Sequence, residues 1–476
     1  MSFDVQALYA AAQPVIFALA VAIVVATAIN NAVYVLQLAV AFIALRRRPP
    51  ISDRREVWAQ YSEATMPISI LVPAYNEEAS VVESVRALLA LSYPNFEVVV
   101  VNDGSKDGTL DALIDAFGLE PVFRVYDTAV SHRPIRGLYG SPRYPKLLVV
   151  DKENGGKADA LNAGINLARM PLFCAIDADS LLENDALLRA VQPFAEDPVD
   201  VLAVGGNIRI ANGCKVRAGQ LLEVGLPRNP LALFQVVEYL RAFLMARLAW
   251  SHMNALLIIS GAFGIFKRGA AIDVGGYSHG TVGEDIEIIV KIRRLIAERK
   301  IRGEVRFVPD PVCWTEAPET LRVLGRQRRR WQRGSLETFF KHMRMTANPR
   351  YGPAGLIGFP YLLLSDVLGP VLEVVGYLLI PLFWAAGVLS LDFFLAYIAL
   401  TFVFGVFISV GSLVLEELQL HRYPRPRDLL LLTLVAVAEN FGYRQLNNFW
   451  RIFGTWEFLR RTEGWGKMER RGFTKG

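Results

Sequence analysis

The chain has 476 residues, of which 53% are hydrophobic and 20% charged, and its mean hydropathy is +0.31. This balance is too apolar for an ordinary soluble protein and favours a membrane protein with a soluble part. The net charge of +5 suits contact with membrane lipid and phosphorylated ligands, and three separated cysteines argue against a disulfide framework or a zinc site.

The first apolar run, 14–45, contains no charged residue. A helix needs roughly 20 apolar residues to span a bilayer, so this run predicts a spanning helix. A cleaved signal peptide is the less compatible alternative, because the basic residues follow the run and the run is too long. Those basic residues, three of them at 46–48, predict by the positive-inside rule an external N-terminus and a cytoplasmic chain from residue 50 onward.

Between about residues 66 and 315, short apolar runs alternate with helical patterns. The predicted strands are 67–75, 96–102, 147–151 and 172–179, and a predicted helix covers 77–91. Near-continuous apolar strands are typical of parallel sheets that are buried on both faces. Their alternation with helices predicts a doubly wound, Rossmann-like α/β domain.

Apolar character returns at Gly355. The pattern predicts an interfacial helix running into a spanning helix over 356–390 and a second span over 393–415. Segment 429–450 is predicted to be re-entrant or interfacial, because a span there would place the basic tail outside the cell. The predicted domains are an N-terminal membrane helix with its basic flank (1–50), an α/β domain (51–350) and a C-terminal membrane region (351–476).

Acidic residues end the fourth predicted strand and precede a helical run further along the chain. Asp177 and Asp179 follow the strand, and carboxylates there suit Mg²⁺ or Mn²⁺, although a solvated acidic turn is the alternative. Asp285, with Glu284 orienting it, is a candidate general base. The alternative is an acidic cluster that only stabilises the helix dipole.

Two loops carry candidate nucleotide contacts. Asp103 ends the second strand, where it either meets a ribose or base edge or simply caps the next turn. Lys157 follows Gly155 and Gly156, an arrangement that lets backbone and charge approach phosphates, although the spacing is not that of a P-loop. The alternative for Lys157 is a solvated lysine in a plain loop.

A basic motif precedes the C-terminal apolar region, with Gln327, Arg330 and Trp331 in the run QRRRW. One reading is a basic belt that contacts lipid head groups, beside an interfacial tryptophan. The functional reading is an interface helix whose Arg330 neutralises a diphosphate and whose Trp331 stacks on a sugar.

Taken in order, these motifs resemble the inverting GT-A glycosyltransferases of family 2, in particular the membrane synthases of cellulose, chitin, hyaluronan and poly-N-acetylglucosamine. The resemblance covers residues 66–335. It rests on the segments VPAYNEE (72–78), VNDGSKDGT (101–109), NGGKADALN (154–162), DAD (177–179), SGAFGIFKR (260–268), GED (283–285) and QRRRW (327–331). The chain reads GED where cellulose synthases read TED.

The resemblance implies a GT-A domain between transmembrane helices and a role for each motif. It implies a nucleotide pocket formed by Ala74, Tyr75, Glu77, Asp103, Lys157 and Asp177. Asp179 would coordinate Mg²⁺ or Mn²⁺, and Asp285 would deprotonate the acceptor hydroxyl. The diphosphate and the acceptor end would be held by Gln327, Arg330 and Trp331.

The expected function is transfer of a sugar from a nucleotide-diphosphate donor, a UDP-sugar, to a growing glycan at the cytoplasmic face of the plasma membrane. The expected reaction is inverting, metal-dependent and processive, and an export partner is compatible with it. One alternative is single-sugar transfer to a lipid-linked acceptor, and another is a non-catalytic membrane receptor or transporter. No nucleic-acid partner is expected, since the basic residues cluster beside apolar segments without a binding motif.

Overall fold

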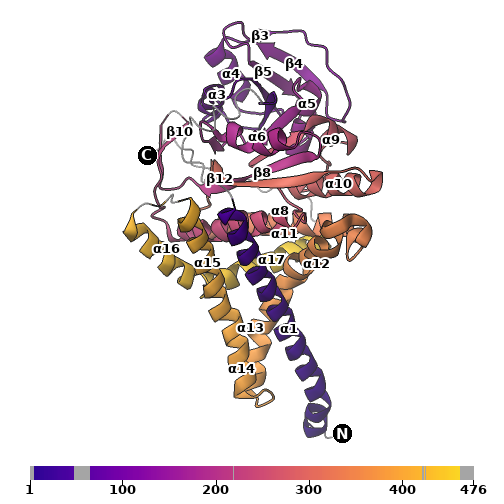
Figure 1. The fold of residues 1–476 in the computed structure, drawn as a ribbon, viewed down its shortest axis with the longest axis vertical. Helices are drawn as coiled ribbons and strands as arrows, with labels where there is room; N and C mark the ends of the chain where they lie inside the picture. The colour runs from indigo at the N-terminus through magenta and orange to yellow at the C-terminus, as the bar shows by residue number, and fades with distance from the viewer. Residues whose placement is uncertain (1–4, 48–64, 218, 421–422, 424, 461–476) are drawn as a thin grey trace.

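The computed structural model describes residues 5–47, 65–217, 219–420, 423 and 425–460. A head built around a sheet stands on a stem of long helices, and the N-terminus lies at the far end of the stem (Figure 1). The two parts meet at a layer of helices that includes α8 (Arg247–His252), α11 (Leu321–Lys341) and α17 (Tyr443–Leu459).

The centre of the head is a ten-stranded sheet in the order β3-β4-β5-β2-β1-β6-β11-β8-β12-β7. Its core strands are β1 (Ile68–Ala74), β2 (Phe96–Asn102), β5 (Leu147–Lys152) and β6 (Leu172–Ile176), and neighbouring core strands run parallel. These are the four apolar runs of the sequence, so the predicted parallel core is confirmed. All four carboxyl ends consequently meet at one edge of the sheet.

The rest of the sheet is mixed, which the prediction of a doubly wound parallel domain did not anticipate. The remaining strands are β3 (Glu120–Pro121), β4 (Ile135–Gly140), β7 (Leu181–Leu182), β8 (Val201–Ile210), β11 (Phe263–Lys267) and β12 (Glu304–Thr315). Strand β11 runs antiparallel to both β6 and β8, while β12 runs parallel to β8. A separate two-stranded ribbon joins β9 (Lys215–Arg217) to β10 (Gln220–Glu223).

Helices cover both faces of the sheet, and an apolar core fills each side. They are α3 (Val81–Leu89), α4 (Thr109–Phe117), α5 (Lys157–Leu167), α6 (Ala186–Glu196), α9 (Arg268–Asp273) and α10 (Glu284–Arg299). The helix predicted from residue 77 begins only at Val81, because backbone groups of Asn76 and Glu77 donate hydrogen bonds to Ser105 and Thr109 instead. The carboxyl edge of the sheet is therefore bordered by well-fixed loops.

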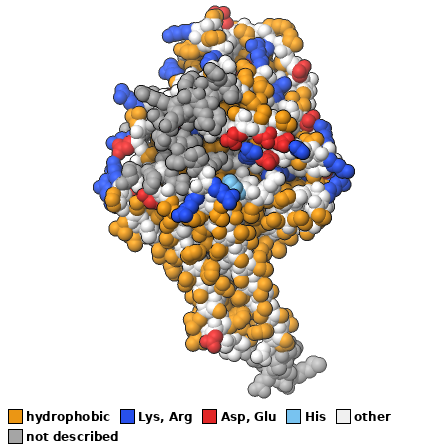
Figure 2. Space-filling model, viewed as in Figure 1, with side chains coloured by type: hydrophobic (Ala, Val, Ile, Leu, Met, Phe, Trp, Pro, Cys, Tyr) orange, Lys and Arg blue, Asp and Glu red, His pale blue; other side chains and the backbone are white. Residues whose placement is uncertain are grey.

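The stem contains three helical segments that are long and apolar enough to cross a membrane: 13–46, 354–385 and 391–418. The first belongs to α1 (Val5–Arg46). The second consists of η4 (Ala354–Gly358), α12 (Phe359–Leu362), η5 (Leu363–Leu368) and α13 (Gly369–Ala385). The third consists of α14 (Leu391–Ile398), η6 (Ala399–Val403) and α15 (Phe404–Gln419). Hydrophobic side chains dominate the stem surface, whereas charges gather on the head (Figure 2). Helices that could span a membrane thus occupy the predicted segments, and the second includes the part that we expected to be interfacial.

Two further helices, α16 (Pro426–Ala438) and α17, are not among the candidate spans of the described chain. Helix α17 is amphipathic, since Phe449, Phe453 and Trp456 are exposed on one side while Arg451 contacts α11 and η5 on the other. An exposed apolar side opposite a polar one is compatible with an interfacial helix, and the re-entrant or interfacial segment expected for 429–450 stays a prediction.

Candidate functional site

A cavity of about 2980 Å³ opens at the carboxyl edge of the parallel strands and extends to the upper stem. It is lined by every residue that the sequence singles out: Ala74, Tyr75, Glu77, Asp103, Lys157, Asp177, Asp179, Glu284, Asp285, Gln327, Arg330 and Trp331. Ordinary small-ligand pockets measure about 300–1,000 Å³. The cavity therefore has room for two substrates side by side.

The loop after β1 forms one end of the cavity. Asn76 adopts a left-handed backbone (φ 57°), and its side-chain oxygen accepts a hydrogen bond from the Lys106 amide at 2.8 Å. The Glu77 amide donates to the Thr109 hydroxyl at 2.9 Å. These bonds hold the loops after β1 and β2 together and leave the Tyr75 ring exposed at the opening.

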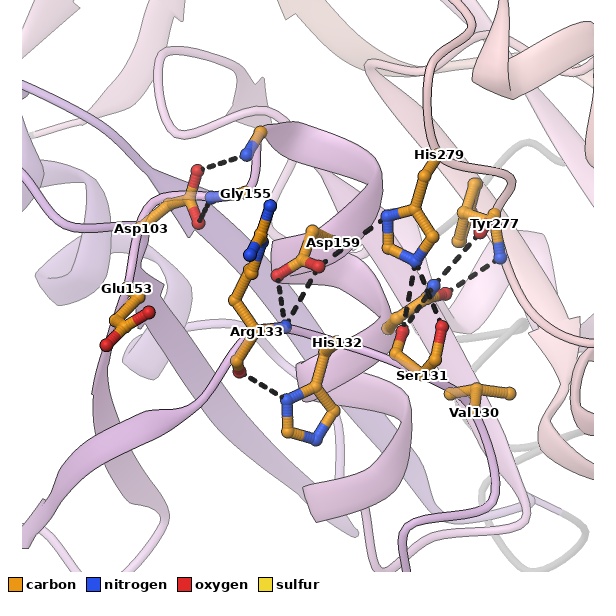
Figure 3. Close-up of polar contacts among 12 residues, drawn as sticks. Asp103, Val130, Ser131, His132, Arg133, Glu153, Gly155, Asp159, Tyr277 and His279 are labelled. Atoms are coloured by element: carbon orange, nitrogen blue, oxygen red, sulfur yellow. Dashed lines mark hydrogen bonds and ion pairs between the residues drawn. The ribbon is translucent and has the colours of Figure 1, made fainter.

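Asp103 organises the glycine loop that precedes α5 (Figure 3). Its carboxylate accepts hydrogen bonds from the amides of Gly155 at 3.0 Å and Gly156 at 2.7 Å, and from the Lys152 ammonium at 2.5 Å. Gly156 has a φ of 88°, which favours glycine. These contacts give Asp103 a structural role in the glycine loop, which differs from the predicted capping of the turn after its own strand, and a contact with a nucleoside stays a prediction.

Lys152 is fully buried between two carboxylates, those of Asp103 and Asp159, each 2.5 Å from its ammonium. Asp159 also accepts from the Arg133 amide and lies 3.5 Å from His279 (Figure 3). Lys152 was not singled out from the sequence, because it occupies the last position of a strand. It nevertheless connects the glycine loop to the opposite face of α5.

Lys157 lies between acidic residues at the cavity floor. Its ammonium is 2.5 Å from Asp177, 3.4 Å from Glu284 and 3.1 Å from the Gly261 carbonyl oxygen. Burial alone would lower the pKa of Lys157, but Asp177 and Glu284 outweigh it and raise the pKa above the ordinary value. Lys157 therefore carries its charge, and its contact with a nucleotide stays a prediction.

Asp285 sits in the first turn of α10, as predicted. One carboxylate oxygen accepts from the Gly261 amide at 3.2 Å and the other from the Ile286 amide at 2.9 Å. Its neighbour Glu284 is buried and reaches Lys157; burial raises the pKa of Glu284 despite Lys157. The Asp285 carboxylate is thus held by the backbone amides of Gly261, which had no assigned role, and of Ile286, and orientation by Glu284 stays a prediction.

Asp177 and Asp179 flank the turn between β6 and β7. The described residues contain no group of three or more histidine, cysteine and acidic side chains arranged for a metal. Mg²⁺ is commonly bound by one or two carboxylates together with substrate phosphates. Because Asp177 and Asp179 supply such hard oxygen atoms to the cavity, the residues present fit a divalent cation bound jointly with a diphosphate.

Helix α11 carries Gln327, Arg330 and Trp331 into the same cavity. The intervening arginines anchor the helix: Arg328 stacks over the Trp331 ring at 4.4 Å and pairs with Glu238 at 2.7 Å. Arg329 pairs with Glu457 of α17 at 2.7 Å. The motif thus supplies residues that line the cavity, Arg328 among them, while the pairs of Arg328 and Arg329 hold α11 in place.

One wall of the cavity is formed by residues that no sequence motif had indicated. It is the continuous helical run of α7 (Pro230–Tyr239), η1 (Leu240–Ala246) and α8, which presents Tyr239, Phe243, Arg247 and Trp250. A mostly apolar helix reads as core, and only the cavity shows that this face is accessible to a ligand.

Two family models match this chain. The model for Glycosyl transferase family 2 matches residues 69–246, and that for Glycosyl transferase family group 2 matches residues 172–408. The poly-beta-1,6-N-acetyl-D-glucosamine synthase of Staphylococcus epidermidis is 30% identical over 274 residues, 58% of this chain and 56% of that protein. The corresponding synthase of Staphylococcus aureus (strain COL) is 29% identical over 290 residues, 60% and 59% of the two chains. This chain thus spans little more than half the length of these relatives.

Among solved structures, the mannosyltransferase PcManGT from Pyrobaculum calidifontis, in complex with GDP-Man and Mn²⁺, aligns with 94% of this chain and 100% of that chain. The TM-score is 0.57 and the identity 22%. At this identity the likeness shows the fold, which is GT-A with a mixed sheet.

The position of Lys152 generates a prediction about stability. Lys152→Met leaves the Asp103 and Asp159 carboxylates buried without their shared cation, and breaking such a pair typically costs on the order of 3–5 kcal/mol. Denaturant unfolding of the purified protein in detergent is expected to show a loss of this size. Lys146→Met is the matched control, since Lys146 is exposed and lies over the Phe96 ring, and its loss should cost below about 1 kcal/mol. Equal effects of the two substitutions would contradict the role given to Lys152.

Proposed function

We propose that this chain is a glycosyltransferase that extends a polysaccharide from a UDP-sugar donor, a proposal supported by its matches to glycosyltransferase family 2 models and by its GT-A fold. The observation that carries this proposal is the single cavity, which joins the strand ends to the stem helices. N-acetylglucosamine is the first sugar to test, since the Staphylococcus relatives are named as poly-N-acetylglucosamine synthases. The non-catalytic receptor or transporter is set aside.

The donor occupies the head end of the cavity in this proposal. The base and ribose lie along Ala74, Tyr75 and Glu77, and the diphosphate reaches the turn of Asp177 and Asp179. A Mg²⁺ or Mn²⁺ ion held by Asp179 would neutralise charge on the leaving diphosphate. Arg330 and Gln327 of α11 donate hydrogen bonds to that diphosphate from the opposite wall.

Asp285 is the base in this proposal. Its carboxylate takes the proton from the acceptor hydroxyl, and the oxygen forms a bond to the anomeric carbon of the donor sugar. The bond from that carbon to the phosphate oxygen breaks, and its electron pair leaves with the nucleoside diphosphate. Attack opposite the leaving group inverts the anomeric configuration. The Gly261 amide supports this role by fixing the Asp285 carboxylate at the helix start.

The membrane arrangement also belongs to the proposal. Arginines directly after the first apolar helix support a cytoplasmic head at the plasma membrane, with the N-terminus outside. Three crossings place both 47–353 and the region after residue 418 on one side, which is consistent with the single head of Figure 1. The division into domains at residues 50 and 350 follows from the same arrangement. Membrane lipid surrounds the stem, and an export partner is compatible with it.

The same cavity also supports a second class of acceptor. The cavity reaches stem residues such as Asn30, Tyr34 and Glu373, so a lipid-linked acceptor has access to Asp285 from the membrane. Single-sugar transfer to that lipid is therefore the alternative, and product length separates the two.

Incubating membranes that contain the protein with radiolabelled nucleotide sugars tests the function. We expect UDP-N-acetylglucosamine to give a long, water-soluble polymer, and a chelator to abolish its formation until Mg²⁺ or Mn²⁺ is restored. A single-sugar lipid product would establish the alternative acceptor. Unreduced synthesis in excess chelator would contradict the metal requirement, and incorporation from none of the donors would contradict the function.

The role of Asp285 is tested by Asp285→Asn, which preserves shape and removes the proton acceptor. General-base catalysis typically contributes ~10²–10⁴-fold, so polymer formation should fall by this factor while calorimetry shows unchanged nucleotide binding. Asp273→Asn is the control, since Asp273 is exposed and pairs with Arg299 on the surface. Near-normal transfer by Asp285→Asn would place the base elsewhere, and lost donor binding would make Asp285 a pocket residue.

A further inference from the structure

We propose that Arg247 holds the terminal sugar of the acceptor beside Asp285, as the polar member of an aromatic subsite on the α7–η1–α8 run. This proposal rests on the proposed function and adds to it a residue that fixes the acceptor.

The subsite is a stripe along one face of that run. The rings of Tyr239 and Phe243 stack with centroids 4.4 Å apart, and the Arg247 guanidinium lies 3.8 Å from the centroid of Phe243. Trp250 continues the stripe and packs against Tyr361 of α12 at 4.9 Å. All four members of the stripe line the cavity. Aromatic faces beside a hydrogen-bond donor suit a sugar ring, which has apolar C–H faces and polar hydroxyl edges.

The helix has an unusual local geometry at this stripe. Residues 240–246 form a π-helix, η1, which connects α7 to α8 without a break. Short π segments inside α-helices occur frequently at functional sites. Here the π segment lies directly between Tyr239 and Arg247, so it sets the spacing of the stripe.

Arg247 differs from the other arginines near this wall in that, among the described residues, its guanidinium has no hydrogen-bond or ion-pair partner. Only 8% of Arg247 is exposed, and within the described residues its guanidinium makes no hydrogen bond or ion pair, with Nη1 buried and unsatisfied. Arg328 by contrast pairs with Glu238, and Arg241 with Glu439. An unpaired buried cation is costly, so its retention in a cavity wall indicates a ligand that supplies the missing acceptors.

Arg247 and Asp285 line the same cavity, and the charge of Asp285 acts on the Arg247 guanidinium. Burial lowers the pKa of Arg247 to about 10, and Asp285 is the first group that opposes this effect. Since the pKa remains well above neutral, Arg247 is charged at physiological pH.

The position of the stripe favours the acceptor over the donor. Groups assigned to the diphosphate lie on the β6–β7 turn and on α11, whereas α8 packs on α1 and lies between the sheet and the stem (Figure 1). Trp250 contacts the stem helix α12 itself. An acceptor glycan that enters the cavity from the stem side therefore meets this stripe before it reaches Asp285.

The test compares Arg247→Met with Arg293→Met. Arg293 is also a buried arginine, but the Leu256 carbonyl and the Asn254 side chain hold it, and it does not line the cavity. Hydrogen bonds to charged groups contribute enough for Arg247→Met to raise the KM for a soluble β-1,6-linked N-acetylglucosamine oligomer by roughly 10- to 100-fold. UDP binding measured by calorimetry should stay within about twofold of the wild type. Arg293→Met should leave the oligomer KM unchanged, whatever its effect on thermal unfolding.

Arg247→Lys adds a second measurement, because lysine keeps the charge but loses the planar fork of donors. We expect its oligomer KM to lie between those of the wild type and Arg247→Met. An unchanged KM in Arg247→Met, or a loss of UDP affinity equal to the rise in KM, overturns the acceptor role. Absence of donor turnover in the wild type would instead overturn the proposed function, and this proposal with it, so the two failures are distinguishable.

Discussion

The ammonium of Lys157 holds together three segments that are far apart in the sequence. It contacts Asp177 after β6, Glu284 at the start of α10 and the carbonyl of Gly261 before β11. Without this cation, the carboxylates of Asp177, Glu284 and Asp285 would face one another and repel. The same Gly261 that accepts from Lys157 donates its amide to Asp285. One charged group therefore sets the distance between the expected diphosphate site and the expected base.

A second set of charges fixes the head on the stem. Arg209 of β8 pairs with Glu416 of α15, and both side chains are buried. Arg451 of α17 bonds Gln332 of α11 and pairs with Asp366 of η5 at 2.6 Å. Separating any of these partners would leave a charge in a poorly solvated place, so the interface resists sliding. These contacts consequently keep the head and the stem in one relative position, so the cavity is continuous from one to the other.

The sequence was sufficient for features that depend on periodicity and on motif order. Continuous apolar runs predicted β1, β2, β5 and β6, and long, mostly apolar segments predicted the stem helices. It was insufficient where strand direction or pairing depends on distant contacts. The antiparallel course of β11 arises from its position between β6 and β8, which no local pattern encodes.

The same limit explains the site residues that were not foreseen. Lys152 reads as the end of a strand, and only the fold shows two carboxylates against it. Arg247 reads as one charge on an apolar helix, and its lack of a partner among the described residues is visible only in three dimensions. Asp103 was expected to contact a nucleoside or to cap the next turn, and its bonds to the distant Gly155 and Gly156 were not foreseen.

The central claim is that donor and acceptor meet at Asp285 within one cavity. Cryo-electron microscopy of the protein in lipid nanodiscs, with a non-transferable UDP-N-acetylglucosamine analogue and Mn²⁺, tests this claim most directly. We predict the base against Ala74 and Tyr75, the diphosphate between Asp179 and Arg330, and the anomeric carbon facing Asp285. A donor bound in the cavity with its anomeric carbon turned away from Asp285, or bound outside the cavity, would contradict the claim.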